Sequence, residues 1–178
     1  MHKAQGVLQG RVRKPSAGPS RTAAAASPKQ ARPLTDFERR LYQACCCIMP
    51  GRVTTYAVLA RILGSCPRAV GQGMKRNPYA PTVPCHRVIA SDFSLGGYHG
   101  GWGTESPEVV RKERMLISEG VEIANHKVDH SAEMSETMLQ LMYSRSVSSG
   151  QFGNSENFKD AAASFQQSLV PSSDEPSL

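Results

Sequence analysis

The residues best suited to chemistry are Cys85 and His86, which stand side by side in the run Pro84-Cys85-His86-Arg87-Val88. A cysteine reacts as its thiolate, and a neighbouring base or positive charge raises the thiolate fraction at neutral pH. Pro84 fixes one backbone angle and should stiffen the approach to Cys85. Adjacent side chains of an extended chain point to opposite faces, so we expect a bridging water or a third group to complete a thiol–imidazole relay. A buried cysteine beside a surface histidine is the alternative that this pair leaves open.

The other four cysteines suggest neither a disulfide framework nor a zinc site. Three of them are consecutive, Cys45 to Cys47, and neighbours in sequence do not pair readily, so a reducing compartment is favoured. At least one of these thiols should fill the core, since a free cysteine behaves as a small hydrophobe. His126 and His130 have ligand-like spacing, but no Cys-x-x-Cys accompanies them. We therefore expect no metal and no cofactor.

Charge and composition divide the chain into three segments. Residues 1–33 are rich in proline and alanine, and residues 1–35 hold seven Lys or Arg and no acid, so we expect a disordered basic arm. Residues 34–124 are the expected folded domain. Residues 125–178 hold three basic and seven acidic residues and are expected to be a largely disordered Ser-rich tail, a helix at Ala132–Tyr143 being the one exception.

A basic arm suits a polyanionic partner, and it also fits a targeting signal. We expect a nuclear location, with mitochondrial targeting by the arm as the alternative. No apolar run approaches membrane-spanning length, so no membrane partner is expected.

Caps and hydrophobic periodicity predict a mostly α fold with short β strands. Thr35 and Glu38 have capping-box spacing ahead of a first helix. A second helix at Thr55–Leu63 and a third from Pro67, capped by Ser65, would form a helix-turn-helix. Further along we expect a strand at 88–90, a helix at 107–118 and an edge strand at 121–123. The expected fold is a winged-helix-like helix-turn-helix domain with disordered tails.

The third predicted helix has an unusual composition. Basic and small residues alternate along it: Arg68, Ala69, Gly71, Gly73, Lys75 and Arg76. Glycines weaken a helix unless something must come close to it. A smooth, positive helix surface can approach a phosphate backbone or enter a groove, so nucleic acid is favoured over a merely solvated helix.

Together these motifs resemble the O6-alkylguanine-DNA alkyltransferases. The resemblance rests on the Pro84–Val88 run, preceded by Pro67-Arg68-Ala69-Val70-Gly71 and Arg76-Asn77-Pro78. Three further motifs match in the same order: Gly51-Arg52-Val53-Thr54-Thr55-Tyr56, Gly96-Gly97-Tyr98 and Glu119-Gly120. The resemblance covers residues 34–124, which correspond to the family's C-terminal catalytic and DNA-binding domain.

The resemblance implies a single-turnover DNA repair protein that moves a methyl or larger alkyl group from guanine O6, and from thymine O4, to its own Cys85. It implies that His86 is the base, acting through a water, and that Glu119 orients the imidazole. Tyr56 would protonate guanine N3, and Asn77 would tie the recognition helix to the active-site strand.

The same resemblance implies a monomer that binds double-stranded DNA containing O6-alkylguanine through the minor groove. The target nucleotide would be flipped out, and Arg68 would fill the gap. The expected DNA contacts are Thr55, Arg68, Ala69, Gly71, Lys75 and Arg76, and the expected base pocket is formed by Pro84, Val88, Tyr98 and His99.

Several features depart from the family pattern. The basic arm stands in place of the family's N-terminal α/β domain, His99 stands where many members have a small hydroxyl residue, and Ala80 where some have proline. An insertion around Trp102–Pro107 lengthens the loop before the last helix. Three other functions remain as alternatives. One is an alkyltransferase-like module that binds the lesion without transfer, a class that lacks the reactive cysteine. The others are a scaffold that only binds DNA through the helix-turn-helix, and a thiol hydrolase.

Overall fold

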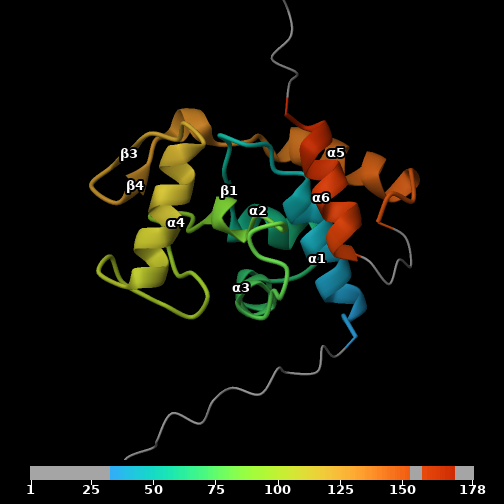
Figure 1. Cartoon of the computed structure of the whole chain (residues 1–178), viewed down its shortest axis with the longest axis horizontal. Helices are drawn as coiled ribbons and strands as arrows, with labels where there is room; N and C mark the ends of the chain where they lie inside the picture. Colours follow the sequence, from blue (N-terminus) through green and yellow to red (C-terminus); the bar gives the residue numbers. More distant parts are fainter. Residues whose placement is uncertain (1–32, 153–157, 171–178) are drawn as a thin grey trace, which may run out of the picture. The chain divides into compact units, whose positions relative to one another are not determined.

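The computed structural model describes residues 33–152 and 158–170 (Figure 1). The chain divides into two units, Met1–Pro33 and Leu34–Leu178. The predicted basic arm, with any targeting signal in it, therefore lies outside the described residues. Among the residues described, no helix has both the length and the apolar character needed to cross a membrane.

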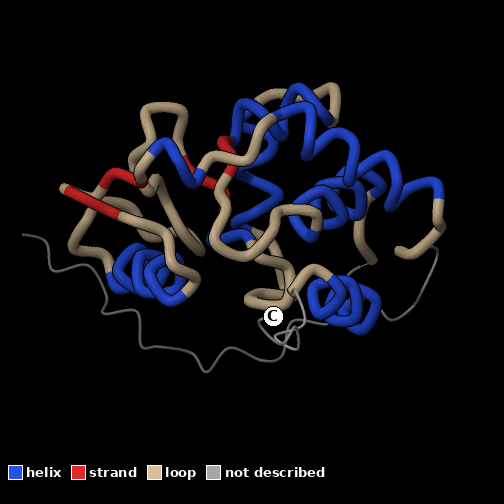
Figure 2. The backbone as a smooth tube through the Cα atoms, turned by 90° about the horizontal axis from the view of Figure 1, so that it is seen from above, coloured by secondary structure: helices blue, strands red, loops and turns tan. Residues whose placement is uncertain are grey.

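Helices dominate the described part of the chain, and its strands are short (Figure 2). The helices are α1 (Asp36–Cys46), α2 (Tyr56–Ile62), α3 (Pro67–Lys75), α4 (Pro107–Ser118), α5 (Glu136–Ser148) and α6 (Phe158–Ser168), with 3-10 turns η1 (Cys85–Arg87) and η2 (His130–Ala132). Strand β1 (Thr54–Thr55) pairs in parallel with β2 (Val88–Ile89), and β3 (Ile123–Ala124) pairs antiparallel with β4 (Lys127–Val128). The expected mostly α class with short strands is confirmed.

The helix starts follow from local capping, with one correction. Thr35 Oγ1 accepts from Glu38 N at 3.2 Å, and Thr35 N donates to Glu38 Oε2 at 3.1 Å, so the predicted capping box of α1 is present. Ser65 was expected to cap α3, but its N-cap is Cys66, without a side-chain hydrogen bond. Pro67 occupies the first helical position, where its fixed φ favours the helix and its missing N–H needs no partner.

The main core surrounds α1 and contains the cysteine triplet. Cys45, Cys46 and Cys47 are all fully buried, and burial raises the pKa of the Cys47 thiol to about 11. Cys45 Sγ lies 3.8 Å from the sulfur of Met74 on α3. The triplet therefore fills the core, as expected.

The expectation that residues 125–178 are largely disordered is wrong for the described part of that segment. Helices α5 and α6 both pack against α1 (Figure 1). Phe158 lies 6.3 Å from Tyr42 and 5.6 Å from Tyr79 between ring centroids, and Phe152 lies 5.2 Å from Phe165. A few large aromatic side chains thus supply enough buried area to order a segment whose average composition is polar. The helix expected at Ala132–Tyr143 is α5 and begins later, after η2.

A second core lies between α4 and the β3–β4 hairpin. It is built from Val53, Ile89, Phe93, Leu95, Val109, Leu116, Val121, Val128 and Ala132. The backbone of Val53 joins it to the segment before α5, since Val53 N donates to Ala132 O at 2.9 Å and Met134 N donates to Val53 O at 2.8 Å. The edge strand expected at 121–123 is displaced to Ile123–Ala124, where it pairs within its own hairpin.

Candidate active site

Cys85 opens the 3-10 turn η1, which leads directly into β2. The pairing of Val88 with Thr54 anchors the end of this turn to β1. Cys85 N donates to Val83 O at 2.8 Å and Arg87 N donates to Pro84 O at 3.0 Å. The extended geometry assumed for the Cys85-His86 pair is therefore wrong: successive side chains of a 3-10 turn are rotated by about 120°, and do not point to opposite faces.

Cys85 lines a cavity of about 470 Å³ between α3 and the loop at 97–102. The residues that line it are Tyr56, Pro67, Arg68, Gly71, Gln72, Met74, Lys75, Cys85, Gly97, Tyr98, His99, Gly100 and Trp102. Seven residues singled out from the sequence therefore meet here, from four separate segments. Pro84 and Val88, expected in the pocket, are buried and do not line the cavity.

The Cys85 thiol is buried and sits among groups that favour its thiolate. Burial raises the pKa of Cys85, while the nearby polar side chains of Asn77 and Tyr98 and the charge of Lys112 oppose this rise. The net direction is upward, so the resting group is the neutral thiol. Reaction at this sulfur therefore requires a base that removes its proton.

Glu119 orients the imidazole of His86. His86 Nε2 lies 2.8 Å from Glu119 Oε1, and both side chains are largely buried. Burial acts to raise the pKa of Glu119, but hydrogen bonds from His86 and Arg87 outweigh it and lower the pKa to about 2. An ionised carboxylate can only accept hydrogen bonds, so Nε2 carries the imidazole proton. Nδ1 is buried and has no hydrogen-bond partner among the described residues, and its lone pair can accept a proton.

Arg87 holds the carboxylate from the other side, a role that sequence reasoning missed. Its Nε lies 2.9 Å from Glu119 Oε2 and its Nη2 lies 2.8 Å from Glu119 Oε1, in a two-pronged pair. Its Nη1 donates to Ile48 O at 2.6 Å and to Gln166 Oε1 at 2.7 Å. The Gln166 amide donates in turn to Cys46 O. The relay behind Cys85 is thus tied to the end of α1 and to α6.

Lys112 of α4 is a second functional residue that the sequence reading missed. It is fully buried, and its Nζ donates to Val88 O at 2.6 Å and to Leu95 O at 2.5 Å. Burial lowers its pKa to about 7, which the negative charge of a Cys85 thiolate would partly reverse. A sequence signal existed, because Lys112 falls on the buried stripe of α4 between Val109 and Leu116.

Hydrogen bonds within the fold position Asn77 and Tyr56. Asn77 is buried, its Nδ2 donates to Val83 O at 3.3 Å, and its Oδ1 accepts from Tyr79 N at 2.9 Å. It thereby ties the end of α3 to the loop that leads to Cys85. Tyr56 donates its hydroxyl hydrogen to Gly97 O at 3.3 Å, and burial raises its pKa to about 12, so it is a neutral phenol that can donate a proton.

The two sides of α3 have different tasks. Arg68 and Lys75 are exposed, and a Cβ added at Gly71 would meet nothing within 4 Å, so this side can be approached closely. Gly73 was read as part of the same smooth surface, but a Cβ there would collide with Leu41 of α1. Gly73 therefore serves the packing of α3 on α1. Ala69 is half-buried outside the cavity lining.

Two of the residues expected to contact DNA are engaged within the fold. Thr55 is buried and its hydroxyl accepts from Val58 N at 3.2 Å as the cap of α2, and its expected contact with DNA stays a prediction. Arg76 Nε donates to the buried Glu38 carboxylate at 3.0 Å and fastens α3 to the start of α1. Among the described residues, no group of three or more His, Cys, Asp or Glu side chains could hold a metal ion.

Comparison with known families gives a match over the central part of the chain. Residues 36–121 match the model of "6-O-methylguanine DNA methyltransferase, DNA binding domain". Two archaeal proteins named methylated-DNA–protein-cysteine methyltransferase are similar. The one from Pyrobaculum aerophilum is 51% identical over 70 residues, which are 39% of this chain and 43% of the relative. The one from Thermococcus sibiricus is 44% identical over 88 residues, 49% and 46% of the two chains. The chain thus spans about half the length of the curated relatives it matches.

Solved structures of the same kind overlay on part of the chain. O6-methylguanine-DNA methyltransferase from Pyrococcus kodakaraensis is 43% identical, with a TM-score of 0.43, and the match covers 49% of this chain and 48% of that one. Atl1 from S. pombe, in complex with damaged DNA containing O6-carboxymethylguanine, is 29% identical with a TM-score of 0.49, covering 58% of this chain and 99% of that one.

Glu119 gives the site an acid-sensitive contribution to stability. Its pKa is depressed from an ordinary value of 4.5 to about 2, so the stabilisation is complete above pH 4.5 and is lost as the pH falls towards 2. We expect Glu119→Gln to remove about 3 kcal/mol of unfolding free energy at neutral pH, and progressively less as the pH falls through this window. Urea unfolding of both proteins between pH 7 and pH 3 measures this difference.

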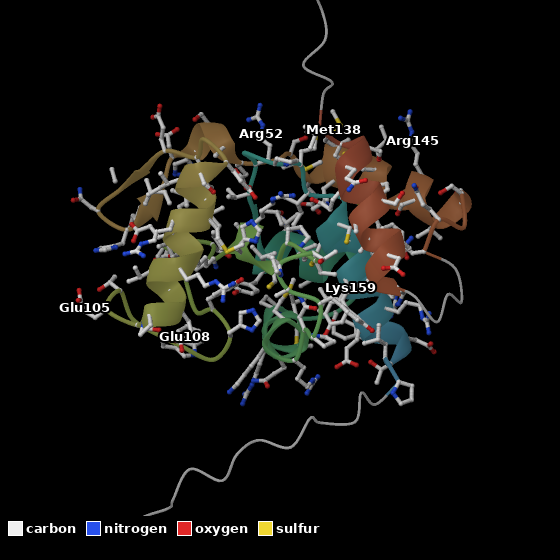
Figure 3. The ribbon with its side chains drawn as sticks, in the orientation of Figure 1. Arg52, Glu105, Glu108, Met138, Arg145 and Lys159 are labelled. Atoms are coloured by element: carbon white, nitrogen blue, oxygen red, sulfur yellow. The ribbon has the colours of Figure 1, made fainter. Side chains whose placement is uncertain are left out.

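The matched control is Glu105→Gln, which removes a carboxylate from an exposed loop position (Figure 3). Its unfolding free energy should follow that of the unsubstituted protein at each pH. The difference in unfolding free energy between Glu119→Gln and the unsubstituted protein should shrink as the pH falls. A difference that stayed constant from pH 7 to pH 3 would contradict an ionised Glu119 at the centre of the site.

Proposed function

We propose that the protein repairs alkylated DNA by direct transfer, because residues 36–121 match the DNA-binding domain of the 6-O-methylguanine DNA methyltransferase family. The alkyl group passes from guanine O6, or from thymine O4, to Cys85 Sγ, in one irreversible turnover per molecule. The observation that carries this proposal is a buried thiol that opens into a cavity beneath α3, with the His86–Glu119–Arg87 relay behind it.

The transfer is a displacement at the alkyl carbon. The thiol proton of Cys85 passes through a water to His86 Nδ1, and the imidazolium that forms is stabilised by Glu119. The thiolate attacks the alkyl carbon, the S–C bond forms, and the O6–C bond breaks with its electron pair on guanine. Tyr56 gives its proton to N3 of the departing base and recovers one from the protonated relay. The products are an S-alkyl cysteine and unmodified guanine, and no cofactor is consumed.

DNA approaches over α3. The exposed Arg68 and Lys75 provide positive charge, and Gly71 provides a surface without a side chain. O6 of a stacked guanine cannot reach a thiol at the base of a cavity, so the nucleotide must leave the helix. Arg68, at the first turn of α3 and on the cavity lining, is placed to fill the gap. We propose that α2 and α3 form a helix-turn-helix that binds duplex DNA in the minor groove, and that the protein acts as a monomer in the nucleus.

Incubation with a duplex that contains one O6-methylguanine tests the transfer. We expect the mass of the intact protein to rise by one methyl group, located on the peptide that contains Cys85. Cys85→Ser should gain no mass and still bind the duplex. Cys66→Ser is the matched control, because Cys66 is exposed at the start of α3 and should be dispensable for transfer.

If the unsubstituted protein binds the same duplex but gains no mass, it recognises the lesion without transferring the methyl group, and the proposed transfer is wrong. Repeated turnover of a small ester would point instead to a thiol hydrolase.

Arg68→Ala tests nucleotide extrusion. We expect transfer from the duplex to slow about tenfold or more, because the unstacked state costs a few kcal/mol and loses the side chain that offsets it. Reaction with free O6-benzylguanine base, which needs no extrusion, should change little. Arg145→Ala removes the same charge from α5, far from α3 (Figure 3), and should leave both rates unchanged. Equal slowing of the duplex and free-base reactions by Arg68→Ala would contradict the extrusion role.

A further inference from the structure

The mouth of the Cys85 cavity carries the chain's single tryptophan, to which the proposed reaction assigns no role. Trp102 is 78% exposed, the highest value among the large apolar side chains described. One exposed apolar side chain is unremarkable in a soluble protein. Trp102, however, shares the cavity lining with the reactive cysteine. An exposed indole beside a reactive thiol can contact a substrate that enters the cavity.

A tight hairpin fixes the position of Trp102. Tyr98 N donates to Gly101 O at 3.1 Å and Gly101 N donates to Tyr98 O at 2.8 Å. His99 and Gly100, the two residues between them, have φ values of 46° and 93°. A type I′ turn requires a positive φ at both of these central positions. Because Tyr98 and Gly101 are paired, Gly97 and Trp102 are the next residues opposite each other. The hairpin thus places both the buried Tyr98 and the exposed Trp102 on the lining of the Cys85 cavity.

One face of the indole packs against Gly97. A Cβ built on Gly97 would lie 2.9 Å from Trp102 Cε2 and 3.1 Å from Trp102 Cδ2. Cε2 and Cδ2 form the bond shared by the two rings of the indole. If Gly97 lay in the plane of the indole, atoms at the outer edge of the rings would be nearer to it than these two. Gly97 therefore touches the flat face of the indole, a contact that a side chain at this position would prevent. The other face is available for an aromatic ring from outside.

The charges around the mouth are arranged asymmetrically. Arg68 and Lys75 lie on the α3 wall, and the Lys75 side chain passes 3.2 Å from the position of a Cβ at Gly100. Glu105 and Glu108 lie on the loop and the first turn of α4 (Figure 3). The exposed Arg111 of α4, whose charge acts on Tyr98 and His99, offsets one of these two negative charges. A DNA strand would place its phosphates towards α3 and away from these carboxylates. The bases of that strand would then face the hairpin that bears Trp102.

We propose that the exposed face of Trp102 stacks on the extruded nucleobase at the cavity mouth. This inference rests on the proposed function and names a further binding residue for its substrate. A base that leaves the duplex loses both stacking neighbours, and an aromatic side chain that offers one face replaces part of that loss. The ligand is the planar purine ring of the damaged nucleotide, so the effect of Trp102 should depend on the lesion that promotes extrusion.

The single tryptophan makes a direct measurement possible, because a base stacked on indole quenches its fluorescence. In Cys85→Ser, which binds without reacting, we expect strong quenching by a duplex containing O6-methylguanine. The same duplex with ordinary guanine should quench clearly less at equal occupancy, with occupancy measured independently by the anisotropy of a dye on the DNA. Equal quenching by both duplexes would place a flanking base on the indole and overturn the proposal, as would no quenching by the bound lesion duplex.

Substitution gives the second readout. We expect Trp102→Ala to weaken binding of the lesion duplex to the Cys85→Ser background about tenfold, within the range measured for base–aromatic stacking. Trp102→Phe should retain most of the affinity because it retains an aromatic face. Thermal unfolding of both variants should match the unsubstituted protein, since the side chain is exposed. Equal affinity of the Ala and Phe variants for the lesion duplex would overturn the stacking role.

The outcomes separate this inference from the proposed function. If the unsubstituted protein transfers the methyl group but the fluorescence and affinity are insensitive to Trp102, only the stacking role fails. If the protein neither binds the lesion duplex nor gains a methyl group, the proposed function fails first and the stacking role falls with it.

Discussion

The buried pair between Arg87 and Glu119 is the interaction on which the candidate site depends. A charged pair removed from water is costly unless nearly every donor and acceptor is satisfied. Here the guanidinium binds the carboxylate through two nitrogens and gives its third to Ile48 O and Gln166. Gly51 N also donates to the same carboxylate at 3.3 Å. The ends of α1, α4 and α6 therefore converge on one ion pair, and this convergence fixes the imidazole of His86.

Burial around Cys85 has two opposing effects on the chemistry. It removes water that would compete at the sulfur, but it also raises the thiol pKa. The polar side chains of Asn77 and Tyr98 and the nearby Lys112 oppose this rise. The neighbouring imidazole can accept the proton, because its other nitrogen is held by an ionised carboxylate. Lys112 also joins β2 to the loop that follows it, through Val88 O and Leu95 O. The same lysine thus holds the backbone of the site in place and stabilises the negative charge of a Cys85 thiolate.

Local signals predicted much of the fold and, together with the family resemblance, most of the cavity. The Thr35–Glu38 capping box and Pro67 at the start of α3 act over a few residues, so a single sequence reveals them. Long-range contacts leave no such pattern: Gln166 lies 79 positions from Arg87, in a segment that reads as a polar tail. The sequence analysis also placed Gly71 and Gly73 on one exposed surface of α3, because sequence spacing alone did not show that Gly73 packs against Leu41.

The protonation state of His86 tests the account most directly. In ¹⁵N-labelled protein with a neutral imidazole, NMR correlations across the ring distinguish the protonated from the unprotonated nitrogen. The account predicts the proton on Nε2, hydrogen-bonded to Glu119, with Nδ1 unprotonated and able to take the proton from Cys85. A neutral ring with its proton on Nδ1 would contradict it, because such a ring could neither donate to Glu119 through Nε2 nor act as a base at Nδ1.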